Sequence, residues 1–541
     1  MIAATTPPPT VGAGANAIEL VLLLLFAATG LAVVARRLGI PYPILLVIGG
    51  ALLGFVPGLP SITLAPDIVF LLFLPPILFG AGFFTSIRDL KRNFRAISLL
   101  AVGLVLFTTV VVAVVARLLI PGLPWPVAFT LGAIVAPPDA VAATAVFQRL
   151  GVPRRVVTIL EGESLLNDAT ALVAYRFAVA AALTGSFSLA NATINFAYVG
   201  IAGVVIGLAA GALVAAVVQR LDDAVFSVVV TILAPASIYA AAEYVGASGV
   251  LAVVLAGIVV GQLAPRRQSS EVRVGGIAAW QVLLFLINGA VFVLIGFQLP
   301  AVVAGLGGRT PTELALLAIA VSLTVIVARI VWVFPGTYIP RRLSEKIRTR
   351  EPYPTRRNVF LVSWAGMRGV VSLAAALAIP VTLQDGVTPF PERNLVIFLA
   401  FAVILATLVG QGLTLPLVIR KLGIVADGGR AHEEAHVRLA AAEAAVARIE
   451  ELAKEWPDHM PLIESLRVQY AHRAEHLDEV HHSGPEDEAE QELLEHREIR
   501  RAVIDAERET ILRMRDGGAV NDEVFRAVER DLDLEELRME A

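Results

Sequence analysis

The residues most able to do chemistry lie in one stretch, 160–173, with the sequence LEGESLLNDATALV. It sits in the middle of an apolar segment that runs from about 156 to 182, so a helix here carries polar side chains toward or into lipid depth: Glu161, Glu163, Asn167 and Asp168. An ionisable side chain at the centre of a membrane helix costs on the order of 2.5–3.5 kcal/mol. Such a group is normally kept because it handles an ion or a proton.

The spacing of these polar residues gathers them on adjoining faces of the predicted helix. Glu161, Ser164 and Asp168 fall at i, i+3 and i+7 and share one stripe. Glu163 and Asn167 fall at i and i+4 and share the neighbouring stripe. The polar groups therefore converge, which indicates a common site.

The composition sets the class of protein. The chain has 541 residues, of which 57% are hydrophobic and 17% charged, and its mean hydropathy is +0.75. These values are typical of a polytopic membrane protein and far too apolar for a soluble enzyme. The absence of cysteine excludes disulfides, thiol catalysis and cysteine-ligated metals. The first apolar run follows an uncharged, proline-rich start, so we interpret it as a retained span and not as a cleaved signal.

The charges divide the chain into two predicted domains. Residues 424–541 contain 31 acidic and 15 basic residues, a net charge of −16. Residues 1–423 contain 28 basic and 16 acidic residues, a net charge of +12. We therefore expect a transmembrane domain over 1–423 and an acidic, helical, cytoplasmic tail over 424–541. Long runs rich in alanine, glutamate and arginine at 431–456 and 485–515 predict helices in this tail.

The apolar runs predict an all-α membrane domain of about thirteen spans. Runs long enough to cross a hydrocarbon core of about 30 Å lie near 17–35, 42–57, 67–85, 96–120, 125–149, 156–183, 194–219, 224–243, 247–264, 276–299, 312–338, 358–381 and 394–420. Every second connection is basic, whereas the intervening ones carry only Arg309 and Arg393. The positive-inside rule then places the N-terminus outside and the tail in the cytoplasm.

Two of the predicted spans contain helix-breaking residues. The fifth contains Pro137 and Pro138 directly before Asp139, and paired prolines remove helix hydrogen bonds. The twelfth contains Arg368 inside a glycine-rich stretch, 364–369. Non-helical backbone is tolerated at membrane depth only where it is buried in protein or lines a wet cavity. Breaks at corresponding positions of two halves predict two inverted six-helix repeats with an ion site at the midplane.

Six stretches of the membrane domain carry distinctive motifs: LPPILF at 74–79, APPDAVAATAV at 136–146, GESLLNDAT at 162–170, Arg329 within VARIVWV, AGMRGVVSLA at 365–374 and VGQGLTLP at 409–416. Together they resemble the motifs of monovalent cation:proton antiporters of the sodium/proton exchanger type. The resemblance covers the whole membrane domain. It implies a thirteen-span fold, usually a homodimer, in which helices five and twelve are unwound and cross near the ion site.

The resemblance also implies roles for particular residues. Asp168 would bind the cation and the proton in turn, with Asn167, Ser164 and the break around Asp139 beside it. Glu163 and Arg329 match the pair that holds two helices together in the family. Pro138 stands where many members carry a threonine, so the preferred cation stays open between Na⁺, Li⁺ and K⁺.

The chemistry of the residues agrees with this resemblance. A carboxylate in a buried, wet site can hold either a proton or a partly dehydrated alkali ion. All eight histidines lie beyond Gly423, so imidazole and thiol ligands are both absent from the membrane domain. This absence argues against a transition-metal transporter or an intramembrane metalloprotease.

We therefore predict an electroneutral antiporter in the cell membrane, not an enzyme, that exchanges Na⁺ (or Li⁺ or K⁺) for a proton in pH and cation homeostasis. We expect no cofactor, no resident metal and no nucleic-acid partner. Two alternatives stay open. A gated monovalent cation channel would pass cation without a proton gradient. A proton-coupled carrier of another substrate would need hydrogen-bonding or aromatic residues around its cavity, and few lie near Asp168.

Overall fold

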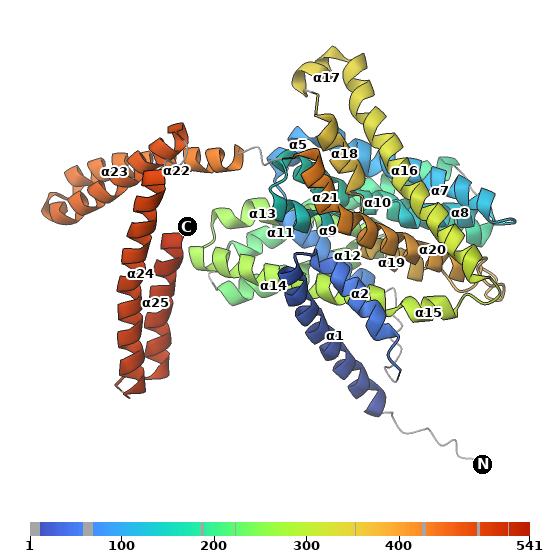
Figure 1. The fold of residues 1–541 in the computed structure, drawn as a ribbon, viewed down its shortest axis with the longest axis horizontal. Coiled ribbons are helices and arrows are strands. Elements are labelled where there is room, and N and C mark those ends of the chain that lie inside the picture. Colours follow the sequence, from blue (N-terminus) through green and yellow to red (C-terminus); the bar gives the residue numbers. More distant parts are fainter. Residues whose placement is uncertain are drawn as a thin grey trace. The chain divides into compact units, whose positions relative to one another are not determined.

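The computed structural model describes residues 11–57, 69–185, 189–221, 223–351, 353–424, 429–483, 487–517 and 519–540 (Figure 1). Every regular element within these ranges is helical, and an isolated β-bridge joins Thr382 to Pro389. The chain divides into two compact units, Met1–Ala426 and Asp427–Ala541.

The first unit is a helical bundle. Its main helices are α1 (Val11–Leu38), α2 (Tyr42–Gly54), α4 (Leu74–Phe83), α5 (Ile87–Arg92), α6 (Phe94–Ser98), α7 (Val105–Leu119), α8 (Trp125–Val135), α9 (Val141–Leu150), α10 (Arg154–Thr184), α11 (Leu189–Val218), α12 (Ala224–Tyr244), α13 (Gly249–Leu263), α14 (Ser270–Phe297), α15 (Leu299–Ala304), α16 (Pro311–Leu343), α17 (Glu345–Arg350), α18 (Arg356–Trp364), α19 (Val370–Leu377), α20 (Arg393–Leu405) and α21 (Gly412–Leu422). Three π-helical segments extend them: η1 (Val69–Phe73) precedes α4, η2 (Leu99–Leu104) joins α6 to α7, and η4 (Ala406–Gln411) joins α20 to α21.

Seven helical stretches in the described part of the chain are long and apolar enough to cross a membrane. They are Phe94–Leu119, Arg154–Thr184, Thr193–Val218, Ala224–Tyr244, Ser270–Ala304, Pro311–Leu343 and Arg393–Leu422. Four shorter apolar helices, Tyr42–Gly54, Val69–Phe83, Trp125–Val135 and Gly249–Leu263, lie among them.

Local side-chain chemistry sets several helix ends. Ser248 and Thr310 accept hydrogen bonds from backbone N–H groups three residues on, which satisfies donors that the first helical turn leaves free. At the other end, α9 and α10 stop at Gly151 and Gly185, whose φ angles of +63° and +68° lie in the left-handed region.

The helices pack closely where one of them presents small residues. Gly203, Gly207 and Gly211 recur every four residues along α11, and a Cβ at any of them would overlap atoms of α13 or of Ser248 at its start. Because glycine has only a hydrogen atom as its side chain, two helix backbones can approach closely at these positions. In a membrane, van der Waals packing of this kind drives helix association.

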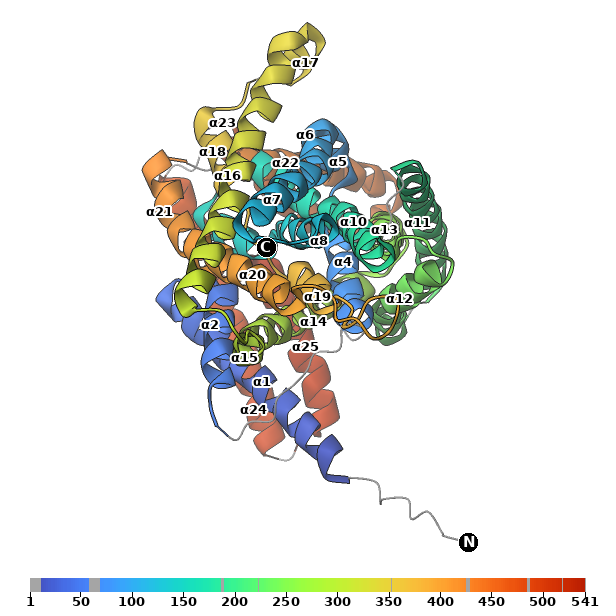
Figure 2. The ribbon, with the colours of Figure 1, turned by 90° about the vertical axis from the view of Figure 1, so that its right-hand side faces the viewer.

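Helix α10 occupies the middle of the bundle. It contacts α4, α6, α7, α8, α13, α18 and α19, and Figure 2 shows it among them with α11, α12 and α16 toward the edges. Two neighbours of α10 are interrupted. The path from α8 to α9 is non-helical over 136–140, and the path from α18 to α19 is non-helical over 365–369. The interruptions fall at the paired prolines and at the glycine-rich stretch.

The described residues of the second unit form four α-helices and a short 3-10 helix, η5 (Pro457–His459). The four α-helices are α22 (Gly429–Glu455), α23 (Met460–Ser483), α24 (Asp487–Asp516) and α25 (Asp522–Glu540). Helices α22 and α23 pack together, as do α24 and α25. The second pair buries Ile504, Phe525 and Leu532, and Arg508 bonds both Asp533 and Glu536 across it. The alanine- and glutamate-rich runs at 431–456 and 485–515 correspond to α22 and α24, whereas α23 was not predicted.

Candidate functional site

Helix α10 brings the predicted polar residues into the centre of the bundle. Glu163 and Asn167 are fully buried, and Asp168 is 7% exposed. Ser164 is partly buried, whereas Glu161 is exposed. The three residues of the predicted stripe therefore do not share one environment, because Asp168 and Ser164 face the interior of the bundle and Glu161 does not.

Two of these side chains hold the backbone between α8 and α9. Asn167 Nδ2 donates to the carbonyl oxygen of Pro138 at 2.7 Å. Ser164 Oγ accepts from the N–H of Ala140 at 3.3 Å. A broken helix leaves backbone groups without their usual partners, and α10 supplies partners for two of them.

Oxygen atoms beside this contact remain without partners. Asn167 Oδ1 is buried and has no hydrogen-bond donor among the described residues. No described residue donates to the carboxylate of Asp168 either. A carboxylate and an amide oxygen on adjacent residues are hard ligands, and hard oxygens suit alkali cations and protons rather than soft metals. Within the described residues, no group of three or more histidine, aspartate or glutamate side chains could hold a resident metal ion.

The two broken paths meet each other at Asp139. The N–H of Asp139 donates to the carbonyl oxygen of Met367 at 2.7 Å. Its Oδ1 accepts from the N–H of Val141 at 2.9 Å, at the start of α9. A Cβ at Gly369, directly before α19, would overlap the Asp139 carboxylate. This carboxylate thus lies at the N-terminal ends of two helices.

Arg368 has the complementary position. Its guanidinium donates to the carbonyl oxygens of Val135 at 3.0 Å, Ala136 at 3.3 Å and Gly366, and the side chain is fully buried. These carbonyls lie at the C-terminal ends of α8 and α18. Helix N-termini favour a negative group and C-termini a positive one. The aspartate and the arginine therefore compensate the four half-helix ends at the crossing.

Glu163 and Arg329 join α10 to α16. Arg329 Nη1 and Nη2 lie 2.5 and 2.8 Å from the two carboxylate oxygens of Glu163, and both side chains are 0% exposed. The same guanidinium donates to the carbonyl oxygen of Val362 on α18 at 3.0 and 3.2 Å. Arg329 on α16 thus links α10, which carries Asp168, to α18, which leads into the second break.

Thr407 is a further member of the crossing that was not predicted from the sequence. Its Oγ1 accepts from the N–H of Arg368 at 3.1 Å, and it lies on the π-helical segment η4. Gln411 lies on the same segment and is 2% exposed, with neither polar atom of its side chain hydrogen-bonded to a described residue. Short π-helical segments are frequent at functional sites. The VGQGLTLP motif at 409–416 was the sequence signal closest to this segment. It includes Gln411 but not Thr407.

A helical bundle with paired backbone breaks, buried charges at the half-helix ends and a carboxylate near the crossing defines a class, the secondary transporters with discontinuous membrane helices. A profile described as "Sodium/hydrogen exchanger, transmembrane" matches residues 21–421. The chain therefore belongs to the sodium/hydrogen exchanger family and is a multi-pass membrane transporter, not an enzyme.

Similar proteins agree with this assignment. An uncharacterized Na⁺/H⁺ exchanger of Mycobacterium tuberculosis is 34% identical over 528 residues, which cover 96% of each chain. A sodium, potassium, lithium and rubidium/H⁺ antiporter of Bacillus subtilis is 36% identical over 416 residues, 74% of this chain and 61% of that protein. The solved structure of a sodium proton antiporter from Methanocaldococcus jannaschii matches with a TM-score of 0.58 at 21% identity, over 75% of this chain and 98% of that one. This match shows the antiporter fold.

Proposed function

We propose that the protein exchanges an alkali cation for a proton at the carboxylate of Asp168. The observation that carries this proposal is the environment of that side chain. It lies on a buried membrane helix, no described donor satisfies it, and the neighbouring Asn167 Oδ1 is also without a partner. Stable folding alone gives no reason to keep an unpaired carboxyl group there, because burial of an unpaired charge is costly.

The exchange follows from competition for one group. Protonation neutralises the carboxylate, and a partly dehydrated cation balances its charge, so one occupant excludes the other. Asn167 Oδ1 and the lone pairs of Ser164 Oγ provide neutral oxygen ligands beside the carboxylate. Coupling arises because the loaded forms can cross the membrane and the empty, charged form is disfavoured in a low-dielectric site.

We propose that Asp139 and Arg368 stabilise the crossing of the two broken paths and do not coordinate the ion directly. Asp139 is engaged with the N–H of Val141 at the start of α9, and Arg368 binds carbonyls at the ends of α8 and α18. Pro137 and Pro138 open the helix so that these groups can meet. The Asp139 carboxylate would contribute to the field at the ion rather than exchange protons itself.

We also propose an arrangement of the chain in the membrane. Thirteen spans in two inverted six-helix repeats would place the N-terminus outside and the acidic tail, 424–541, in the cytoplasm. Transmembrane domain 1–423 would form a homodimer in the cell membrane. The B. subtilis relative is named for four alkali cations, so we propose Na⁺ as the principal ion, with Li⁺ and K⁺ as further substrates, in pH and cation homeostasis.

The test is the substitution Asp168→Asn, assayed as cation-driven proton flux in proteoliposomes with Na⁺, Li⁺ and K⁺. We expect flux at the level of empty liposomes and an unchanged or higher melting temperature, because the change removes an unpaired buried charge. Glu161→Gln is the matched control, since it removes an exposed carboxylate from the same helix. Substantial exchange by well-folded Asp168→Asn protein would overturn the assignment. Cation flux in the unmodified protein that is not accompanied by proton flux in the opposite direction would indicate a channel instead.

A further inference from the structure

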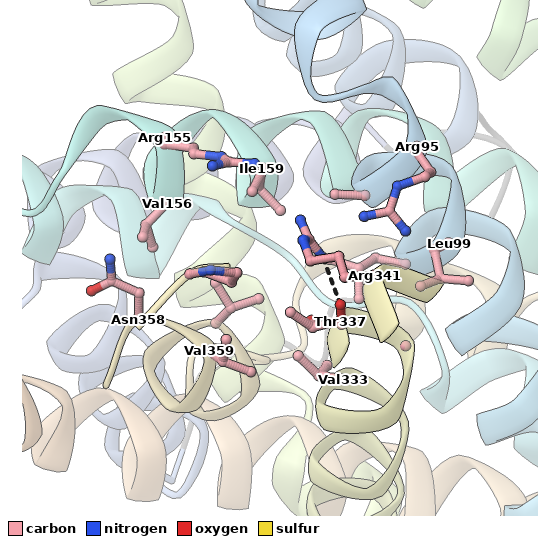
Figure 3. A pocket seen from close by; sticks show the side chains of 15 residues that line it. Arg95, Leu99, Arg155, Val156, Ile159, Val333, Thr337, Arg341, Asn358 and Val359 are labelled. Carbon is pink, nitrogen blue, oxygen red and sulfur yellow. Dashed lines mark hydrogen bonds between the residues drawn. The ribbon is translucent and has the colours of Figure 1, made fainter. Parts of the chain in front are cut away.

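A cavity of about 80 Å³ lies away from Asp168, at the end of the bundle where the basic connections gather. Its walls come from α6, η2, α10, α16 and α18. Most of the lining is apolar, including Ile159, Val333 and Val359, and three arginines stand around it (Figure 3). Figure 3 shows Arg95, Arg155 and Arg341 approaching the cavity from three different elements.

One of these arginines is fully engaged. The side chain of Arg341 is 3% exposed and donates to the carbonyl oxygens of Thr337 and Glu351 and to the carboxylate of Glu351. It is therefore a fixed positive charge in the cavity wall. The carboxylate of Glu351 also accepts from Nε and Nη2 of Arg95, at 2.7–3.3 Å.

Donors of the other two arginines remain available. Arg95 Nη1 has no described partner. Arg155 donates only from Nε, to Asn93 Oδ1 at 3.3 Å, and it forms no ion pair with any described residue. The side-chain amide of Asn358, a further lining residue, has no described hydrogen bond. Arg95, Arg155 and Asn358, which come from three different elements, thus line the same cavity with donors that have no described partner.

The charges around the cavity do not balance. Three arginines face one carboxylate, Glu351, whose pKa is held below its ordinary value chiefly by the hydrogen bonds from Arg95, so it stays ionised at neutral pH. The cluster keeps two positive charges in excess. Arginine forks match oxyanions such as carboxylate and phosphate, and a partly enclosed site strengthens such bonds.

We propose that this cavity binds a phosphate group, held by Arg155 with Arg95 Nη1 and Asn358. The apolar walls suit the organic part of a phosphate diester or monoester, so the phosphate can belong to an anionic phospholipid or to a soluble ester. The site is formed by α10, which carries Asp168, and by α18, whose Val362 accepts from Arg329 and also lines the cavity. Occupancy would therefore stabilise the helices that hold the ion site.

Binding can be measured without transport, so its failure would leave the proposed antiport untouched. Purified protein in neutral detergent is titrated with phosphatidylglycerol, with phosphatidylcholine, and with glycerol 3-phosphate, and bound adducts are followed by native mass spectrometry and by melting temperature. Arg155→Gln and Asn358→Ala are the test variants. Arg88→Gln is the matched control, because Arg88 is an exposed arginine of α5 with no described ion pair.

We expect phosphatidylglycerol or glycerol 3-phosphate to bind and to raise the melting temperature, and phosphatidylcholine to have a far smaller effect. Loss of one charge-assisted contact should weaken binding at least about tenfold in Arg155→Gln, and less in Asn358→Ala, with no change in Arg88→Gln. A response to the lipid alone assigns a membrane source, and a response to the ester alone assigns a soluble one. Equal binding by Arg155→Gln and Arg88→Gln, or no response to either phosphate compound, would overturn the proposal.

Discussion

Breaking the buried ion pair between Glu163 and Arg329 tests how the bundle is held together. Glu163→Gln keeps the volume of the side chain but leaves the guanidinium without a counter-charge. Arg329→Met leaves the carboxylate unpaired and also removes the donors of the Val362 carbonyl. Both side chains are 0% exposed, so water cannot take the place of the lost partner. Each single substitution should lower the free energy of unfolding by about 3–5 kcal/mol.

The double substitution separates pairing from general damage. Glu163→Gln with Arg329→Met removes both charges, so the penalty for an unpaired buried ion disappears. We expect its cost to fall below the sum of the two single costs by at least about 2 kcal/mol. Unfolding of the purified protein by denaturing detergent, followed by tryptophan fluorescence, would give all three values.

An exposed pair in the same unit provides the control. Arg348 and Glu345 lie 2.9 Å apart with side chains 49% and 79% exposed. Glu345→Gln should cost no more than about 1 kcal/mol. If the buried substitutions cost as little as this one, or if their effects simply add, the pair does not connect α10 to α16 in the way described.

Two further predictions concern pH. The pKa of Glu351 is lowered from its ordinary value of 4.5 chiefly by Arg95, so its stabilisation is present above that value and is lost as pH falls through the lower folded-state pKa. Glu351→Gln should reduce the melting temperature at neutral pH, and the difference should vanish well below pH 4; a constant difference at every pH would contradict this. Deleting residues 430–541 removes every histidine and should keep exchange but move its pH profile, whereas an unchanged profile would favour a dimerisation or folding role for the tail.

Local sequence signals predicted those parts of the fold that depend on local physics. Apolar runs mark helices because a membrane span must satisfy its own backbone hydrogen bonds. Pro137 and Pro138 mark a break because proline lacks the N–H that a helix needs. The polar composition of 460–483 gave no comparable signal, and α23 was missed. Similarly, helical spacing placed Glu161 on the same face of α10 as Asp168. Which faces of α10 are buried depends on the helices that pack around it, and the sequence of α10 does not contain this information.

Contacts between distant segments could not be predicted in this way. Arg329 lies 166 residues from Glu163, and only the family resemblance paired them. The position of Arg368 at the carbonyl ends of two helices, and of Asp139 at two N-terminal ends, requires the crossing itself. The cavity between Arg95, Arg155 and Arg341 likewise combines donors from α6, α10 and α18. Each of these helices adjoins a basic connection, and nothing in its own sequence indicates that it meets the other two.

The structure also bears on the number of charges moved per cycle. The residue before Asp168 is Asn167, so this part of the site has one carboxylate. Asp139, the nearest second candidate along the broken path, is engaged at the start of α9. A single carboxylate that carries either one proton or one monovalent cation has the same net charge in both loaded forms, so exchange should be one for one and electroneutral.

This stoichiometry can be measured with proteoliposomes held at different membrane potentials by gradients of a permeant lipophilic anion, because K⁺ is itself a proposed substrate. A potential of 100 mV acts on each net charge with about 2.3 kcal/mol, which would move the equilibrium Na⁺ ratio about fifty-fold in a cycle that transfers one charge. We expect the equilibrium point to stay where the chemical gradients of Na⁺ and H⁺ place it. A shift with voltage would require a second proton carrier. Asp139→Asn would then be the variant to examine, because loss of the shift in that protein would show that its carboxylate titrates during transport and does more than compensate the helix ends.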